Sequence, residues 1–156
     1  MKRKRGEIGD MKSTSEILMV DDNPADIDLT TEVLAQIEGR YHMNSVNDGE
    51  EAISFLRHQG KYAKAPVPDL VVLDLNLPRK DGCEVLSNIR ADPALARIPV
   101  VIFTTSQANS DISRSYDVGA NCYLRKPGNL AEFVAAVQSM AEFWLGFATL
   151  PQKEKR

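Results

Sequence analysis

Short runs of consecutive apolar residues alternate along this chain with stretches in which apolar residues recur at helical spacing. Apolar runs without a polar break are typical of strands that are buried on both faces of a sheet. The most continuous runs are 17–20, 70–73 and 100–103, while 42–46 and 122–124 are a weaker and a shorter run. The pattern therefore predicts five short strands.

A helical segment follows each predicted strand. Asn23 and Pro24 are typical of the N-cap and first turn of a helix, and Gly39 and Gly119 are typical of residues that end one. The expected helices cover 24–39, 49–58, 82–90 and 110–118, with a last one that begins near 129. Strands that alternate with helices predict right-handed βαβ units and a parallel sheet covered on both faces.

In such sheets the ligand site lies at the carboxyl ends of the strands, so the residues just after each strand are the candidates. Acids favour strand ends and helix N-termini in any case, which explains each acid singly but not the whole set. Three neighbouring carboxylates repel one another, and a hard divalent cation such as Mg²⁺ relieves that repulsion. The set comprises Asp21, Asp22, Asp74, Asn76, Thr104 and Lys126.

Asp21-Asp22, Asp74 with Asn76, Thr104, and Lys126-Pro127 together resemble the receiver domain of two-component response regulators. The resemblance implies an α/β, flavodoxin-like, doubly wound sheet of five parallel strands in the order 2-1-3-4-5, with five helices. With the polar residues before it and the apolar residues after it, we expect three segments: a flexible basic and polar tail over 1–15, a receiver domain over 16–142 and an apolar C-terminal extension over 143–156.

The resemblance further implies a role for each site residue. Asp74 is expected to accept a phosphoryl group from a histidine kinase. Asp22, Asp74 and the backbone carbonyl of Asn76 are expected to bind Mg²⁺, and Asp21 through a water molecule. The cation, Thr104 and Lys126 then neutralise charge on the phosphoryl oxygens, which is what phosphoryl transfer mainly requires.

Thr104 and Tyr123 are expected to form the switch: Thr104 moves toward the phosphoryl oxygens and Tyr123 turns inward. The alternative for Tyr123 is an ordinary half-buried strand aromatic. The resemblance also implies a cis peptide between Lys126 and Pro127. Gly128 departs from the family pattern, which has an aromatic residue after this proline, so we expect the last helix to begin differently.

The segment from Phe143 to Leu150 is unusually apolar for the end of a helix, with Phe143, Trp144 and Phe147 in five residues. One interpretation is that it folds back on its own core. The other is a homodimer interface formed by Tyr123, Phe143, Trp144 and Phe147, because exposed aromatic patches mark contact sites. This ending resembles the response regulators that serve cyanobacterial-type phytochromes, as do Gln59-Gly60-Lys61-Tyr62 and Asn121-Cys122-Tyr123-Leu124. The resemblance implies a phytochrome-type kinase as partner.

Composition and charge exclude several kinds of partner and location for this protein. A net charge of −3 argues against nucleic acid as a partner, and no apolar run is long enough to cross a membrane. Two distant cysteines fit a reducing cytoplasm. The basic run from Lys2 to Arg5 is interpreted as a flexible tail; a weak patch for nucleic acid or anionic lipid is the alternative. Few residues follow Lys126, so we expect no DNA-binding output domain, and an output by protein contact or phosphate return.

Two rival functions use a similar sheet. A phosphatase of the haloacid dehalogenase type also phosphorylates an aspartate, but it needs a second acid two residues further on, where this chain has Asn76. A flavodoxin-like FMN binder cradles phosphate after the first strand, where Asp21 and Asp22 would repel it. We therefore expect a signalling protein rather than an enzyme, with the phosphatase as the alternative.

Overall fold

The computed structural model describes residues 14–39 and 41–152, so nearly all of the predicted basic tail lies outside the described residues. The strands are β1 (Ser15–Val20), β2 (Tyr41–Val46), β3 (Leu70–Leu73), β4 (Val100–Thr104) and β5 (Cys122–Arg125). The α-helices are α2 (Pro24–Ala35), α3 (Gly49–Leu56), α4 (Gly82–Ala91), α5 (Asn109–Val118) and α6 (Leu130–Ala141). The shorter helical turns are η1 (Gly60–Tyr62) and η2 (Glu142–Phe147).

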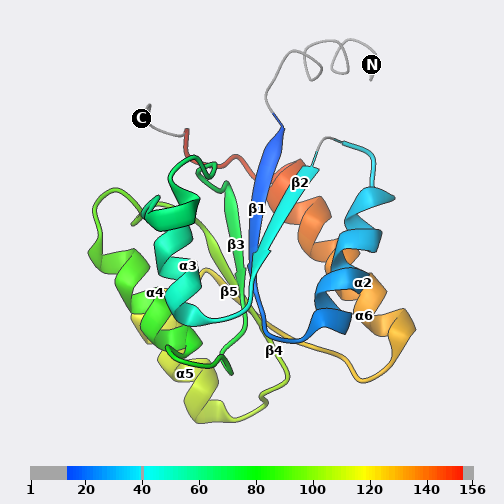
Figure 1. Cartoon of the computed structure of the whole chain (residues 1–156). Helices are drawn as coiled ribbons and strands as arrows, with labels where there is room; N and C mark the ends of the chain where they lie inside the picture. Colours follow the sequence, from blue (N-terminus) through cyan, green and yellow to red (C-terminus); the bar gives the residue numbers. More distant parts are fainter. Residues whose placement is uncertain (1–13, 40, 153–156) are drawn as a thin grey trace.

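The five strands form one parallel sheet in the order β2-β1-β3-β4-β5, which confirms the predicted fold. The chain leaves β1 toward β2 on one side and returns to place β3 on the other side. The order therefore reverses between β1 and β3, and a sheet of this kind binds its ligand at that point. Figure 1 shows the strands in the middle, with α3, α4 and α5 on one face and α2 and α6 on the other.

Side chains alternate along each strand between two hydrophobic cores, one on each face of the sheet. In β1, Leu18 and Val20 join the core under α3 and α4, while Ile17 and Met19 join the core under α2 and α6. All four side chains are at most 2% exposed. The two-sided burial explains why the strands appear in the sequence as unbroken apolar runs.

The helix ends follow the local signals in most places. The Asn23 side chain accepts hydrogen bonds from the N–H groups of Ala25 and Asp26, with Pro24 in the first turn, and Asn129 caps α6 in the same way. The first helix is shorter than predicted, because α2 ends at Ala35 rather than near Gly39. Gly39 has a φ of 134° and forms the turn into β2 instead.

One helical turn was not predicted, and the predicted last helix changes its form after residue 141. The 3₁₀ turn η1 lies between α3 and β3, and the π-helical turn η2 continues α6. Within the described residues, no helix combines the length and the apolar character that crossing a membrane requires.

Candidate functional site

Two buried acids face each other at the point where the strand order reverses. Asp21 follows β1 and Asp74 follows β3, and these strands pair through Val20 and Leu73. Asp21 Oδ1 accepts the N–H of Asn23 at 2.9 Å, and Asp74 Oδ1 accepts the N–H of Asn76 at 3.2 Å. Each acid therefore has one oxygen fixed by the backbone two residues further on and the other oxygen free to face the site.

Asp22 supplies a third carboxylate, and unlike the other two it is exposed to solvent. One oxygen from each of Asp21, Asp22 and Asp74 lies within 4.8 Å of the others. An all-oxygen set of this kind, open on one side, fits a hard divalent cation that keeps some of its water. The structure thus brings together the three predicted acids, with Asn76 beside them.

Lys126 places its ammonium group among these acids. Its Nζ lies 2.7 Å from Asp21 Oδ2 and 3.0 Å from Asp74 Oδ2, and the side chain is only 4% exposed. A third carboxylate, Asp26 Oδ2, lies 2.9 Å from the same nitrogen. An ammonium has three N–H donors, and each has a carboxylate partner here.

Burial and charge act in opposite directions on these groups. Burial raises the pKa of Asp21 above its ordinary value, although the hydrogen bonds from Lys126 and from the Asn23 N–H partly offset this rise. Burial disfavours the Lys126 ammonium, but the hydrogen bonds to Asp21 and Asp26 and the charge of Asp74 outweigh it and raise the pKa of this lysine. Lys126 therefore remains a cation throughout the neutral pH range.

The hydroxyl of Thr104 is an unsatisfied polar group at the same edge. Thr104 is the last residue of β4 and is fully buried, and its Oγ1 has no hydrogen-bond partner among the described residues. A buried hydroxyl without a partner costs free energy and is uncommon, so it calls for an explanation. A hydroxyl at this place can donate to an oxygen that arrives beside Asp74.

Tyr123, the second predicted switch residue, is half-buried in β5. Its phenol oxygen donates to the backbone carbonyl of Ser106 at 3.0 Å, and its ring packs against the core under α4. This arrangement is that of a half-buried strand aromatic, and it describes one position of the ring. The switch itself remains a prediction.

The predicted cis peptide between Lys126 and Pro127 is wrong for this structure, in which no described peptide bond is cis. The trans form is the ordinary preference even before proline, by about 0.5–1 kcal/mol. In this form Lys126 already has its partners, since its N–H donates to the carbonyl of Thr104 at 2.7 Å and its ammonium reaches the acids. Gly128 beyond it borders open space: a Cβ there would meet no atom within 4 Å.

Close packing of α4 against the end of β3 supports the site from behind. A Cβ on Gly82 would lie 2.2 Å from the backbone oxygen of Asp74, which only glycine avoids. The Gly82 N–H also donates to the carbonyl of Leu75 at 2.9 Å. The glycine therefore lets the first turn of α4 touch the backbone that carries Asp74.

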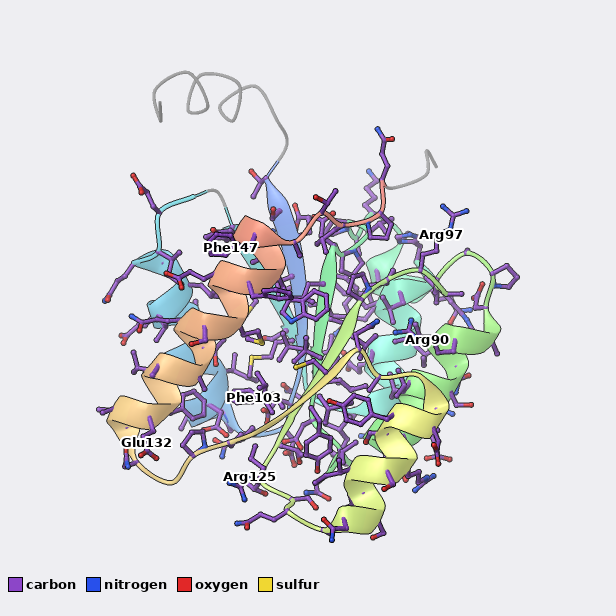
Figure 2. All side chains as sticks on the ribbon, turned by 180° about the vertical axis from the view of Figure 1, so that it is seen from behind. Arg90, Arg97, Phe103, Arg125, Glu132 and Phe147 are labelled. Atoms are coloured by element: carbon purple, nitrogen blue, oxygen red, sulfur yellow. The ribbon has the colours of Figure 1, made fainter. Side chains whose placement is uncertain are left out.

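Some of the C-terminal aromatic residues pack on the core of their own domain, and others are exposed as a homodimer interface would require. Trp144 and Leu145 pack against the core under α6, whereas Phe143 and Phe147 are 53% and 81% exposed. Phe143 and Trp144 meet edge to face, with ring centroids 5.3 Å apart. Figure 2 labels Phe147 on the α6–η2 stretch and Arg125, the last residue of β5, toward the opposite end of the sheet. Asp21 and Asp74 follow the carboxyl ends of β1 and β3.

Asp26 is the site residue that the sequence analysis missed. It lies in the first turn of α2, where an acid is ordinarily explained by the helix dipole. Nothing in the sequence indicates that Lys126, one hundred residues away, reaches it.

A cavity of about 350 Å³ at the opposite end of the strands, beside Asp69 and Pro99, includes none of these acids in its lining.

The fold, the three acids at the switch point and the buried lysine define a receiver domain. Residues 17–138 match the response regulator receiver domain family, and the chain belongs to that family. It is 46% identical to the response regulator Rcp1 of Synechocystis sp. over 135 residues, which cover 86% of this chain and 92% of that one.

Two solved structures of similar sequence have the same fold. The phosphorylated cyanobacterial phytochrome response regulator RcpA has a TM-score of 0.87 and 48% identity, over 90% of this chain and 100% of that one. The Mn²⁺-bound form of Rcp1 has a TM-score of 0.86 and 45% identity, over 88% of this chain and 99% of that one. The predicted family is thereby confirmed, and the comparisons lend no support to the phosphatase alternative.

Proposed function

We propose that this chain is a phosphoacceptor of a two-component system, in which Asp74 takes a phosphoryl group from a histidine kinase. The observation that carries the proposal is the position of the Asp74 carboxylate, beside Asp21 and 3.0 Å from the Lys126 ammonium. In the transfer, the P–N bond of a phosphohistidine breaks and a P–O bond to an Asp74 oxygen forms. The product is an acyl phosphate.

The residues of the chain supply position and charge rather than proton transfer. The Asn76 N–H and Lys126 hold the two Asp74 oxygens in place before the reaction. Lys126 and the Thr104 hydroxyl are the donors for the phosphoryl oxygens afterwards. When bound, Mg²⁺ supplies positive charge to the same oxygens, and Asp22, Asp74, the Asn76 carbonyl and, through water, Asp21 would hold it.

We infer the partners from the relatives. RcpA, which is 48% identical to this chain, is named as a cyanobacterial phytochrome response regulator, and this favours a phytochrome-type kinase as the donor. The match covers 92% of the response regulator Rcp1, and we propose output by contact with another protein. We place this exchange in the cytoplasm and expect the regulator to act as a homodimer.

The test is phosphorylation with acetyl phosphate and Mg²⁺, read by intact mass. One phosphoryl group should be added to the wild type, and peptide mapping should place it on Asp74. Asp74→Asn keeps the size but removes the nucleophile, so the added mass should disappear. Asp22→Asn or a chelator should reduce labelling at least tenfold, because a ligand or the cation itself is lost.

The donor is tested separately from the chemistry. Purified histidine kinases of the source genome, each labelled with radioactive phosphate, are mixed with the chain at short times. A phytochrome-type kinase should transfer its label faster than the others. Full labelling of Asp74→Asn would contradict the assignment of Asp74 as the phosphorylation site. Preferred transfer from a kinase of another class would contradict only the proposed partner.

A further inference from the structure

Asp26 stands apart from the other acids of the site because its recorded partner is the lysine. Asp26 Oδ2 lies 2.9 Å from Lys126 Nζ. It is not part of the group of acids whose oxygens all lie within 4.8 Å of one another, which comprises Asp21, Asp22 and Asp74. Among the described residues, the structure thus separates three acids that could hold a cation from a carboxylate that is paired with the ammonium.

The backbone fixes Asp26 in this place. Its N–H donates to the Asn23 side chain at 3.3 Å, in the capped first turn of α2. Asn23 is in turn tied to Asp21 through its own N–H. The carboxylate is 22% exposed, against 1% for Asp21, so it borders the solvent on one side of the ammonium.

The charge of Asp26 opposes the role that Lys126 has toward a phosphoryl group. Once Asp74 carries that group, the N–H donor that faced Asp74 Oδ2 can turn to a phosphoryl oxygen, while Asp21 and Asp26 keep the other two donors. A carboxylate in contact with the ammonium cancels part of its field at the phosphoryl group and repels that dianion directly. At separations of a few ångströms in a partly buried site, solvent and salt screen such interactions much less than they do in bulk water.

We infer that Asp26 is a positioning residue that holds Lys126 through one N–H donor and thereby weakens its attraction for the phosphoryl group. The inference rests on the proposed function, because it concerns the same phosphoryl group on Asp74. It makes Asp26 a determinant of how readily the phosphorylated state forms and how strongly it is held.

The experiment is a calorimetric titration of the full chain with beryllofluoride at saturating Mg²⁺, where the anion stands in for the phosphoryl group. In Asp26→Asn the side chain keeps its size and an acceptor oxygen but loses its charge. The dissociation constant should fall about five- to tenfold. Asp28→Asn removes the same charge from an exposed position of the same helix and is the matched control, with an expected change below twofold.

Two further measurements separate this role from a general effect on the fold. The Mg²⁺ dissociation constant, measured without beryllofluoride, should change less than twofold in Asp26→Asn, because Asp26 is not one of the three acids that could hold the cation. In a Lys126→Met background, Asp26→Asn should tighten beryllofluoride binding less than twofold, because the effect acts through the ammonium. Melting curves check that all variants are folded.

An unchanged or larger beryllofluoride dissociation constant in Asp26→Asn would overturn the inference. So would an equal fold-change in the Lys126→Met background. Both results leave the proposed function intact, provided that the wild type binds beryllofluoride and is labelled on Asp74. A wild type that binds no beryllofluoride at any Mg²⁺ concentration would overturn both proposals together.

Discussion

At the scale of the residue, the site joins two buried acids, one buried ammonium and one unsatisfied hydroxyl. The acids and the lysine satisfy one another, since Lys126 contacts Asp21 and Asp74 directly. The hydroxyl of Thr104 differs from them, because it is fully buried with no partner among the described residues. A cost of this kind is typical of a group whose partner arrives only in another state of the protein.

Replacing Thr104 by valine tests that interpretation, because the two side chains have nearly the same shape. Loss of an unsatisfied buried hydroxyl should raise the free energy of unfolding of the unphosphorylated protein by about 1 kcal/mol. The value is measured by urea denaturation without Mg²⁺. A lower free energy of unfolding in Thr104→Val would show that the hydroxyl already has a partner in the resting state.

The same variant separates phosphorylation from signal transmission. Lys126 and the acids remain, so acetyl phosphate should still label Asp74 in Thr104→Val. The response of Tyr123 should be lost, because the hydroxyl that draws β4 toward the phosphoryl group is gone. Resonances of a fluorinated Tyr123 report this with beryllofluoride bound. A full wild-type response in the variant would disconnect Thr104 from the switch.

At the scale of the element, the sequence predicted the strands and most helix ends, and it failed where contacts between distant segments decide. Asn23 caps the helix that it was expected to cap, and Asn129 caps the last helix at its predicted start, because these hydrogen bonds are local. The end of α2 was predicted at Gly39, although the helix ends at Ala35. A glycine near a helix end shows only where the chain can turn. Asp26 was missed because its partner lies one hundred residues away.

Close contact between α4 and the end of β3 gives a prediction about element packing. A methyl group on Gly82 would lie 2.2 Å from the Asp74 carbonyl oxygen, so α4 must move away. Overpacking of this kind costs about 1–3 kcal/mol, and Gly82→Ala should lose that much and label more slowly with acetyl phosphate. Gly128→Ala is the control, because its methyl group enters open space near the same site. Equal behaviour of the two variants would contradict the proposed role of the contact.

A tyrosine links η1 to α3 and gives a prediction about pH. Burial, together with the hydrogen bond that the Tyr62 phenol donates to Glu51, raises the pKa of Tyr62 to about 12. Because folding raises this pKa, the contribution to stability is fully present below pH 10 and is lost as the pH rises through about 12. An absorbance titration at 295 nm should show one late ionising step that is absent in Tyr62→Phe. Loss of an earlier step instead would place the raised pKa on another tyrosine.

At the scale of the whole molecule, the phosphorylation site and the C-terminal aromatic residues occupy different parts of the surface. The carboxylates lie at the carboxyl ends of the strands, whereas η2 continues α6 away from them (Figure 1). The parallel sheet and its two-sided core were predictable from the apolar runs and the helical periodicity, because both patterns follow from burial. The strand order came from the family resemblance. The division of the aromatic residues was not predictable, since the sequence gives the same apolar signal for a ring on the core and for a ring in solvent.

The different exposure of these aromatic residues makes the prediction of a homodimer more specific. Phe147 is 81% exposed, so Phe147→Ala should leave the melting temperature of the protomer within about 2 °C. If Phe147 anchors the interface, its loss costs about 2 kcal/mol of association, which is about thirtyfold in the dimer dissociation constant measured by sedimentation. Trp144 packs on its own core, so Trp144→Ala should lower the melting temperature by several degrees. A wild type that stays monomeric at hundreds of micromolar, with and without beryllofluoride, would rule out the dimer and leave Phe143 and Phe147 as a surface for another protein.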